Sequence, residues 1–174
     1  MISEGSIRVG VQSGVVWIRV EGKGSFQNST ALKDFAKAMM ARGHRRFVVD
    51  LEQCPLMDST FMGTLAGIAL RMQGVDPGLV EVVRLNARTR SLLSNLGLDQ
   101  ILRLCDEVPG ERGQSVPPEA PETPETLSQV PCDKRTQAAT MLEAHQAVVD
   151  VNPENQAKFK DVLEFLRQDL GMKA

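Results

Sequence analysis

Hydrophobic and polar residues follow two different periods along the first hundred positions of the chain. The opening segment predicts a β-hairpin, because residues 7–11 and 15–20 read as strands and Ser13-Gly14 supplies a turn. The later elements expected from the same reading are a helix from an Asn28 or Ser29 cap to Gly43, a strand at 47–51, a helix that starts at Asp58-Ser59-Thr60 and ends at Gly74, a strand at 79–85, a helix from Asn86 to Gly97 and a strand at 101–104. Strands that alternate with helices predict an α/β fold with a parallel or mixed sheet and crossover helices.

The composition changes sharply after this unit. Between residues 107 and 131, prolines stand among glutamates and large apolar side chains are scarce. Such a segment cannot bury enough apolar surface to offset the entropy lost on ordering. The sequence therefore predicts three parts, an α/β domain at residues 1–106, a linker at 107–131 and a further module at 132–174.

The last part has the pattern of a helical hairpin. Apolar residues from Ala138 to Val149 form one helical stripe, and Asn152-Pro153 is expected to cap a second helix that ends at Gly171. Two helices of this size need a third surface to cover their apolar faces. We expect the hairpin to dock on the domain, pair with another copy or bind a partner.

Composition and charge exclude several classes of function. With 20 basic and 22 acidic residues the formal net charge is −2, which gives no electrostatic footprint for nucleic acid. No stretch is long and apolar enough to predict a membrane span, and no leader pattern opens the chain, so we expect a cytoplasmic protein. The 3 cysteines are widely separated and fit reduced thiols, and no metal or other cofactor is expected.

The most informative candidate site is Asp58-Ser59-Thr60, between a buried strand and an apolar helix. Each of these short polar side chains can cap a helix by accepting from free backbone N–H groups. A phosphate on Ser59 would meet those donors and the positive end of the helix dipole, worth about 0.3–1 kcal/mol at an exposed site. The alternative is a plain capping sequence without chemistry.

Three segments in this order resemble the STAS family, which is named after sulfate transporters and anti-sigma factor antagonists. They are residues 47–51, residues 57–60, and residues 83–86 leading into 92–98. The resemblance covers about the first hundred residues and implies a STAS-like mixed sheet with crossover helices, to which the C-terminal helical hairpin is an addition of unknown purpose.

The resemblance also implies a function. Free-standing bacterial members of the family bind an anti-sigma factor that is also a serine kinase, and so release a sigma factor for transcription. Phosphorylation at the matching serine blocks that binding, and a PP2C-like phosphatase is expected to reverse it. Carried onto this chain, Ser59 is the phosphate acceptor, Asp58 shapes the loop, and Thr60 is a second possible acceptor.

One departure from the family pattern concerns partner binding. Phe61 and Met62 stand where family members usually have a glycine directly after the motif. These two side chains are either part of an exposed partner-binding surface with Asp58, Ser59 and Thr60, or they are buried in the core, as large apolar residues usually are.

Two other classes of function compete with the switch. The added hairpin on its tether suits a scaffold, an accessory subunit of a signalling or lipid transport complex, or self-association through the C-terminal helices. An enzyme is not expected, because neither His44 nor His145 falls beside a nucleophile by motif and no phosphate-cradling glycine loop is present.

Overall fold

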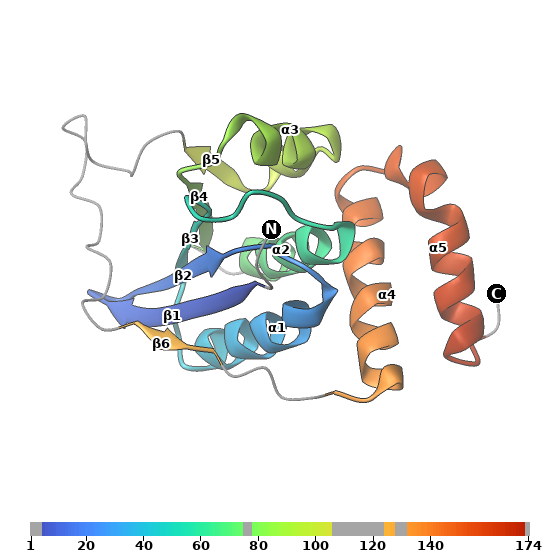
Figure 1. The fold of residues 1–174 in the computed structure, drawn as a ribbon, viewed down its shortest axis with the longest axis horizontal. Coiled ribbons are helices and arrows are strands. Elements are labelled where there is room, and N and C mark those ends of the chain that lie inside the picture. The colour runs from blue at the N-terminus through green and yellow to red at the C-terminus, as the bar shows by residue number, and fades with distance from the viewer. Residues whose placement is uncertain (1–4, 75–77, 106–123, 128–131, 173–174) are drawn as a thin grey trace.

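The computed structural model describes residues 5–74, 78–105, 124–127 and 132–172. Within them, the chain forms a six-stranded sheet with the order β5-β4-β3-β2-β1-β6 (Figure 1). The strands are β1 (Ser6–Gln12), β2 (Val15–Glu21), β3 (Arg46–Asp50), β4 (Leu79–Val83), β5 (Arg103–Cys105) and β6 (Glu125–Thr126). Strands β2 to β5 are parallel to one another, and β1 is antiparallel to both of its neighbours. The mixed α/β sheet expected from the sequence is confirmed.

The antiparallel part is the predicted hairpin. Gln12 pairs with Val15, so the connection consists of Ser13 and Gly14 alone. Both have positive φ, 54° and 79°, which suits a two-residue hairpin turn because the twist then matches that of the strands.

Helices connect the parallel strands and cover one face of the sheet. The helices are α1 (Phe26–Ala41), α2 (Ser59–Gln73), α3 (Ala87–Asn95), the 3-10 turn η1 (Leu98–Gln100), α4 (Lys134–Val151) and α5 (Asn155–Asp169). The main core lies between the sheet and this helical layer, where Ile18 and Phe47 meet Leu32 of α1 and Leu65 of α2. Helix α2 is buried along most of its length, because the sheet covers one side of it and α4 covers another (Figure 1).

Several element boundaries differ from those expected, and β4 ends at Val83 instead of residue 85. Helix α1 begins at Phe26, because Ser25 is the N-cap and Asn28 completes a capping box from the third helical position. A 3-10 turn precedes β5, which spans residues 103–105 instead of the expected 101–104. Helix α5 begins at Asn155, after a turn in which the Asn152 side chain accepts from the backbone N–H of Glu154.

The predicted linker lies largely outside the described residues. Of its described part, Glu125 and Thr126 form β6 and pair with Val9 and Arg8 of β1. The hairpin is present as predicted, and of the surfaces that could cover it the structure shows the first: α4 packs on α2, and α5 packs on the far side of α4 (Figure 1). Within the described residues, no helix has both the length and the apolar character needed to cross a bilayer.

We predict that Phe61→Ala lowers the free energy of unfolding by about 3–5 kcal/mol, because the ring is 0% exposed and its removal leaves a cavity in the main core. Urea denaturation measures this change as a lower midpoint. Phe165→Ala is the matched control, since that ring is 66% exposed and its loss should alter stability by no more than about 0.5 kcal/mol. Equal effects of the two variants would contradict the burial of Phe61.

Candidate functional site

The start of α2 is fixed by the carboxylate of Asp58. This residue is the N-cap of the helix, and its Oδ1 accepts from the backbone N–H of Phe61 at 2.8 Å. Its Oδ2 accepts from the backbone N–H of Phe26, the first residue of α1, at 2.9 Å. One side chain thus holds the first turns of two helices together. The role of Asp58 in shaping this loop for a partner stays a prediction.

Ser59, the first residue of α2, is half-buried at the edge of the site. Its Oγ lies 2.9 Å from Nε2 of His145, which comes from α4. The other ring nitrogen, Nδ1, lies 2.6 Å from the carbonyl oxygen of Met141. Because a carbonyl can only accept, Nδ1 carries a hydrogen, and in the tautomer with its single hydrogen there Nε2 accepts from the Ser59 hydroxyl. The imidazole is 2% exposed and meets the edge of Phe159 of α5, with ring centroids 5.2 Å apart.

The structure brings Ser59 and His145 together, although no sequence motif places either histidine beside a nucleophile. The two residues are 86 positions apart, and no local motif links them. The only signal in the sequence is a histidine within the apolar stripe of the hairpin, which identifies a partner only after the hairpin is docked.

For Phe61 and Met62 the sequence left two alternatives, an exposed partner-binding surface or the buried core, and the structure decides between them. Phe61 and Met62 are 0% and 5% exposed and belong to the main core, so their side chains support the site from beneath. Direct contact of these two side chains with a partner, as the first alternative required, does not fit their positions. Thr60 is also buried, and its carbonyl oxygen accepts from the hydroxyl of Thr64.

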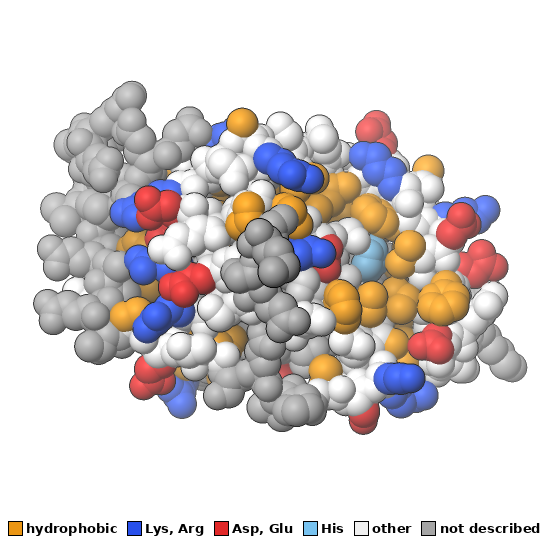
Figure 2. Space-filling model, viewed as in Figure 1, with side chains coloured by type: hydrophobic (Ala, Val, Ile, Leu, Met, Phe, Trp, Pro, Cys, Tyr) orange, Lys and Arg blue, Asp and Glu red, His pale blue; other side chains and the backbone are white. Residues whose placement is uncertain are grey.

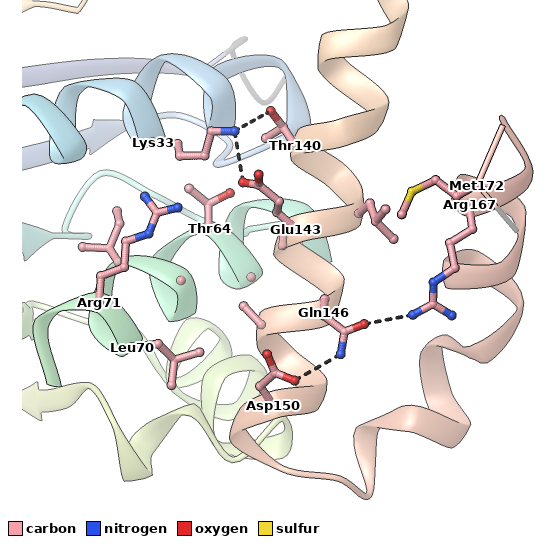
Figure 3. A pocket seen from close by; sticks show the side chains of 16 residues that line it. Lys33, Thr64, Leu70, Arg71, Thr140, Glu143, Gln146, Asp150, Arg167 and Met172 are labelled. Atoms are coloured by element: carbon pink, nitrogen blue, oxygen red, sulfur yellow. Dashed lines mark hydrogen bonds and ion pairs between the residues drawn. The ribbon is translucent and has the colours of Figure 1, made fainter. Parts of the chain in front are cut away.

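Helix α4 approaches α2 most closely at Gly63. A Cβ atom at this position would overlap the backbone carbonyl of Ala144, so only glycine permits the contact. One turn later the helices are further apart, since a Cβ at Gly67 would meet only the Cβ of Ala147 at 3.9 Å. A cavity of about 460 Å³ opens on this side of the crossing, and Arg71 and Asp150 are among its lining residues (Figure 3).

Polar contacts also hold the middle of α4 against α1. The hydroxyl of Thr30 donates to the hydroxyl of Thr140 at 3.0 Å, and the ammonium of Lys33 lies 3.1 Å from the carboxylate of Glu143 (Figure 3 shows the lysine pair). The lysine also donates to Thr140 at 3.3 Å. The surface that α4 covers is therefore contributed by α1 and α2, whose first turns both donate a hydrogen bond to Asp58.

Ionisable groups also lie at the carboxyl ends of β3 and β4. Asp50 is buried beside the guanidinium groups of Arg19 and Arg84, at 3.5 and 3.8 Å. On the loop that follows, burial raises the pKa of the Cys54 thiol, whose Sγ donates to the carbonyl of Leu56. Among the described residues, no group of three or more acidic, histidine or cysteine side chains could hold a metal ion.

The family model described as "Mlab, STAS domain" matches residues 7–104 of the chain. The chain belongs to the STAS family. The match runs from β1 to β5 and includes Asp58 and Ser59, whereas His145 and both helices of the hairpin lie beyond it. No curated protein sequence matches the chain.

Solved structures show the same fold. A proposed anti-sigma factor antagonist from Thermotoga maritima has a TM-score of 0.52 at 18% identity, covering 59% of this chain and 87% of that one. An anti-sigma factor antagonist from Mycobacterium paratuberculosis has a TM-score of 0.52 at 25% identity, covering 58% and 85%. The anti-sigma factor antagonist SpoIIAA in its unphosphorylated form has a TM-score of 0.50 at 15% identity, covering 61% and 93%. The STAS family and its anti-sigma factor antagonist-like fold, expected from the sequence, are confirmed.

We predict that Asp58→Ala lowers the free energy of unfolding by about 1–2 kcal/mol, because the first turns of α1 and α2 both lose a hydrogen-bond acceptor. Asp58→Asn is the comparison variant, because its amide oxygen can still cap α2 whereas its NH2 group cannot accept from Phe26, so it should lose only the contact with α1. Chemical denaturation of both variants measures the difference. An alanine variant as stable as the asparagine variant would show that the cap is dispensable.

Proposed function

We propose that this protein is a bacterial regulatory module of the anti-sigma factor antagonist type. Its binding to an anti-sigma factor with serine kinase activity is switched by phosphorylation of Ser59. The observation that carries the proposal is the place of this serine, which is the first residue of α2, only half-buried and inside the family match. The proposed partner acts in the cytoplasm, and the proposal assigns the protein to the same compartment.

The local structure is compatible with a phosphate. A helix N-terminus offers unpaired N–H groups and a positive dipole end to an anion, so phosphorylation does not require α2 to unfold. The modification adds about −1.5 to −2 charge at neutral pH, which repels an acidic partner surface. A local change of charge can thus alter one contact while the fold stays the same. A PP2C-like phosphatase would restore the binding form.

The neighbouring residues have supporting roles in this proposal. Asp58 fixes the loop that presents Ser59, and Phe61 and Met62 anchor the first turn of α2 in the core. Thr60, buried one position further along, is retained as a secondary acceptor. No catalytic role is assigned to any of them, because in this proposal the kinase and the phosphatase supply the chemistry.

The second candidate is a scaffold or accessory subunit that does not switch, in a signalling assembly or a lipid transport complex. Two observations favour it. The Ser59 hydroxyl already has a partner in His145, and the hairpin leaves apolar surface uncovered (Figure 2). A groove of about 500 Å³ between α4 and α5 includes Met141, Val162 and Phe165, and such a surface suits self-association or a protein partner.

For the switch, we predict that Ser59→Asp weakens binding to the cognate kinase by about tenfold or more, because juxtaposed like charges cost several kcal/mol. Ser59→Ala should bind constitutively, since it cannot accept a phosphoryl group. Titration calorimetry with the purified kinase and ATP measures both. Ser91→Asp is the matched control, an added charge at an exposed serine of α3. Native-like, ATP-sensitive binding by both Ser59 variants would refute the switch.

The scaffold candidate gives a different expected result. Intact-mass measurement of the protein from its native host, with site mapping, should find phosphate on Ser59 if the switch operates and none under any growth condition if the protein is a scaffold. Light scattering should then show association of the scaffold, and Phe165→Asp should reduce it by placing a charge in the apolar groove. A phosphate-free chain that stays monomeric at all concentrations would contradict self-association.

A further inference from the structure

The cavity of about 460 Å³ beside the α2–α4 crossing has walls that the fold holds in place. Ala147 and Val148 of α4 belong to the main core, and the contact between α4 and α2 is extensive. The volume lies within the range of about 300–1,000 Å³ that is typical of small-molecule sites. A small molecule therefore meets a cavity that is already formed, and its binding needs no rearrangement of the hairpin.

One face of α2 forms a wall of this cavity. Thr64, Gly67 and Arg71 lie at helical spacing along that face, and all three line the cavity (Figure 3). Side chains of a helix lean towards its N-terminus, so Arg71 extends back over Gly67 in the direction of Thr64. Because Gly67 has no side chain, it leaves room beneath the arginine.

The contact between the two helices does not require a glycine at position 67. A Cβ atom there would meet only the Cβ of Ala147, at 3.9 Å, whereas a Cβ at Gly63 would overlap the backbone of Ala144. A glycine inside a helix lowers stability relative to alanine. What Gly67 provides in return is free volume in the cavity.

The charged side chains that line the cavity pair with neighbours, with one exception. They are Lys33, Arg71, Glu143, Asp150 and Arg167. Lys33 lies 3.1 Å from Glu143, and Gln146 both accepts from Arg167 and donates to Asp150 (Figure 3). Arg71 makes no hydrogen bond or ion pair with any residue that the structure describes. The cavity thus has one positive charge without a partner.

We propose that this cavity binds a small organic anion that carries one negative charge and an apolar body. The charge pairs with the guanidinium group of Arg71, whose planar donors hold a carboxylate or a similar oxyanion by two hydrogen bonds. The apolar body lies against Gly67, Ile68 and Leu142, which line the same cavity. The ligand contacts the domain and the hairpin together, so its binding stabilises the folded chain.

The site goes beyond the proposed function and does not depend on it. Neither Ser59 nor His145 lines the cavity. One wall belongs to α2, inside the family match, and the other to the hairpin, beyond it. The hairpin therefore adds a small-molecule site to the domain, and a bound anion is a second input besides any partner protein.

Fluorescence titration of the full-length protein tests the role of Arg71 with two probes. Anilinonaphthalene sulfonate is an anion with an aromatic body, and phenylnaphthylamine has the same body without the sulfonate. Arg71→Gln should weaken binding of the anion by about tenfold and leave the affinity for the uncharged probe unchanged. Arg88→Gln is the matched control, since it removes an exposed arginine of α3 outside the cavity and should change neither affinity.

The position of the probes is tested by filling the cavity. Gly67→Leu places a side chain in it and should abolish binding of both probes, with a native midpoint in urea as proof of folding. Phe165→Asp alters the separate groove between α4 and α5 and should leave both affinities unchanged. If the leucine variant does not fold, the comparison of Arg71→Gln with Arg88→Gln decides alone.

Several results would overturn the inference. They are an anion affinity that Arg71→Gln does not lower, binding that survives in a folded Gly67→Leu variant, binding that is lost with Phe165→Asp, and no binding of the anion at about 1 mM. None of these measurements involves phosphorylation of Ser59, so the proposed switch stands or falls separately.

Discussion

The site depends on the two carboxylate oxygens of Asp58. One accepts from the first turn of α2 and the other accepts from the first backbone N–H of α1. These helices cross over between different pairs of strands, so their starting points are set independently unless a shared group joins them. Asp58 is that group. It fixes where Ser59 lies relative to α1, and α1 in turn supplies Thr30 and Lys33, which contact the same face of α4.

Helix α4 contacts α1 and α2 at three separate points. Its Thr140 and Glu143 meet α1, its Ala144 meets Gly63, and its His145 meets Ser59. Since these contacts come from two helices held together by Asp58, α4 fits only when both starts are in register. The position of the hairpin therefore depends on the geometry of Asp58 and Ser59. A change at Ser59 alters its hydrogen bond with the buried ring of His145 in α4.

The sequence was sufficient for the features that depend on local patterns. The alternation of residues 7–20, the apolar strand around Phe47 and the Asn86 cap each predict an element that the structure contains. The start of α1 was misplaced because Ser25 and Asn28 form a capping box together, whereas Asn28 alone has the pattern of an N-cap. The contact of Ser59 with His145 could not be predicted, because it depends on where a hairpin docks after a segment whose sequence carries no docking signal.

Gly63 shows why the hairpin packs so closely against the domain. Glycine within a helix lowers its stability by roughly 0.5–1 kcal/mol relative to alanine, so its presence in α2 needs a reason. The close approach of the Ala144 carbonyl provides that reason. The close approach also brings Ala147 and Val148 of α4 into the main core beside α2. The residue that makes the contact possible therefore joins the hairpin to the interior of the domain.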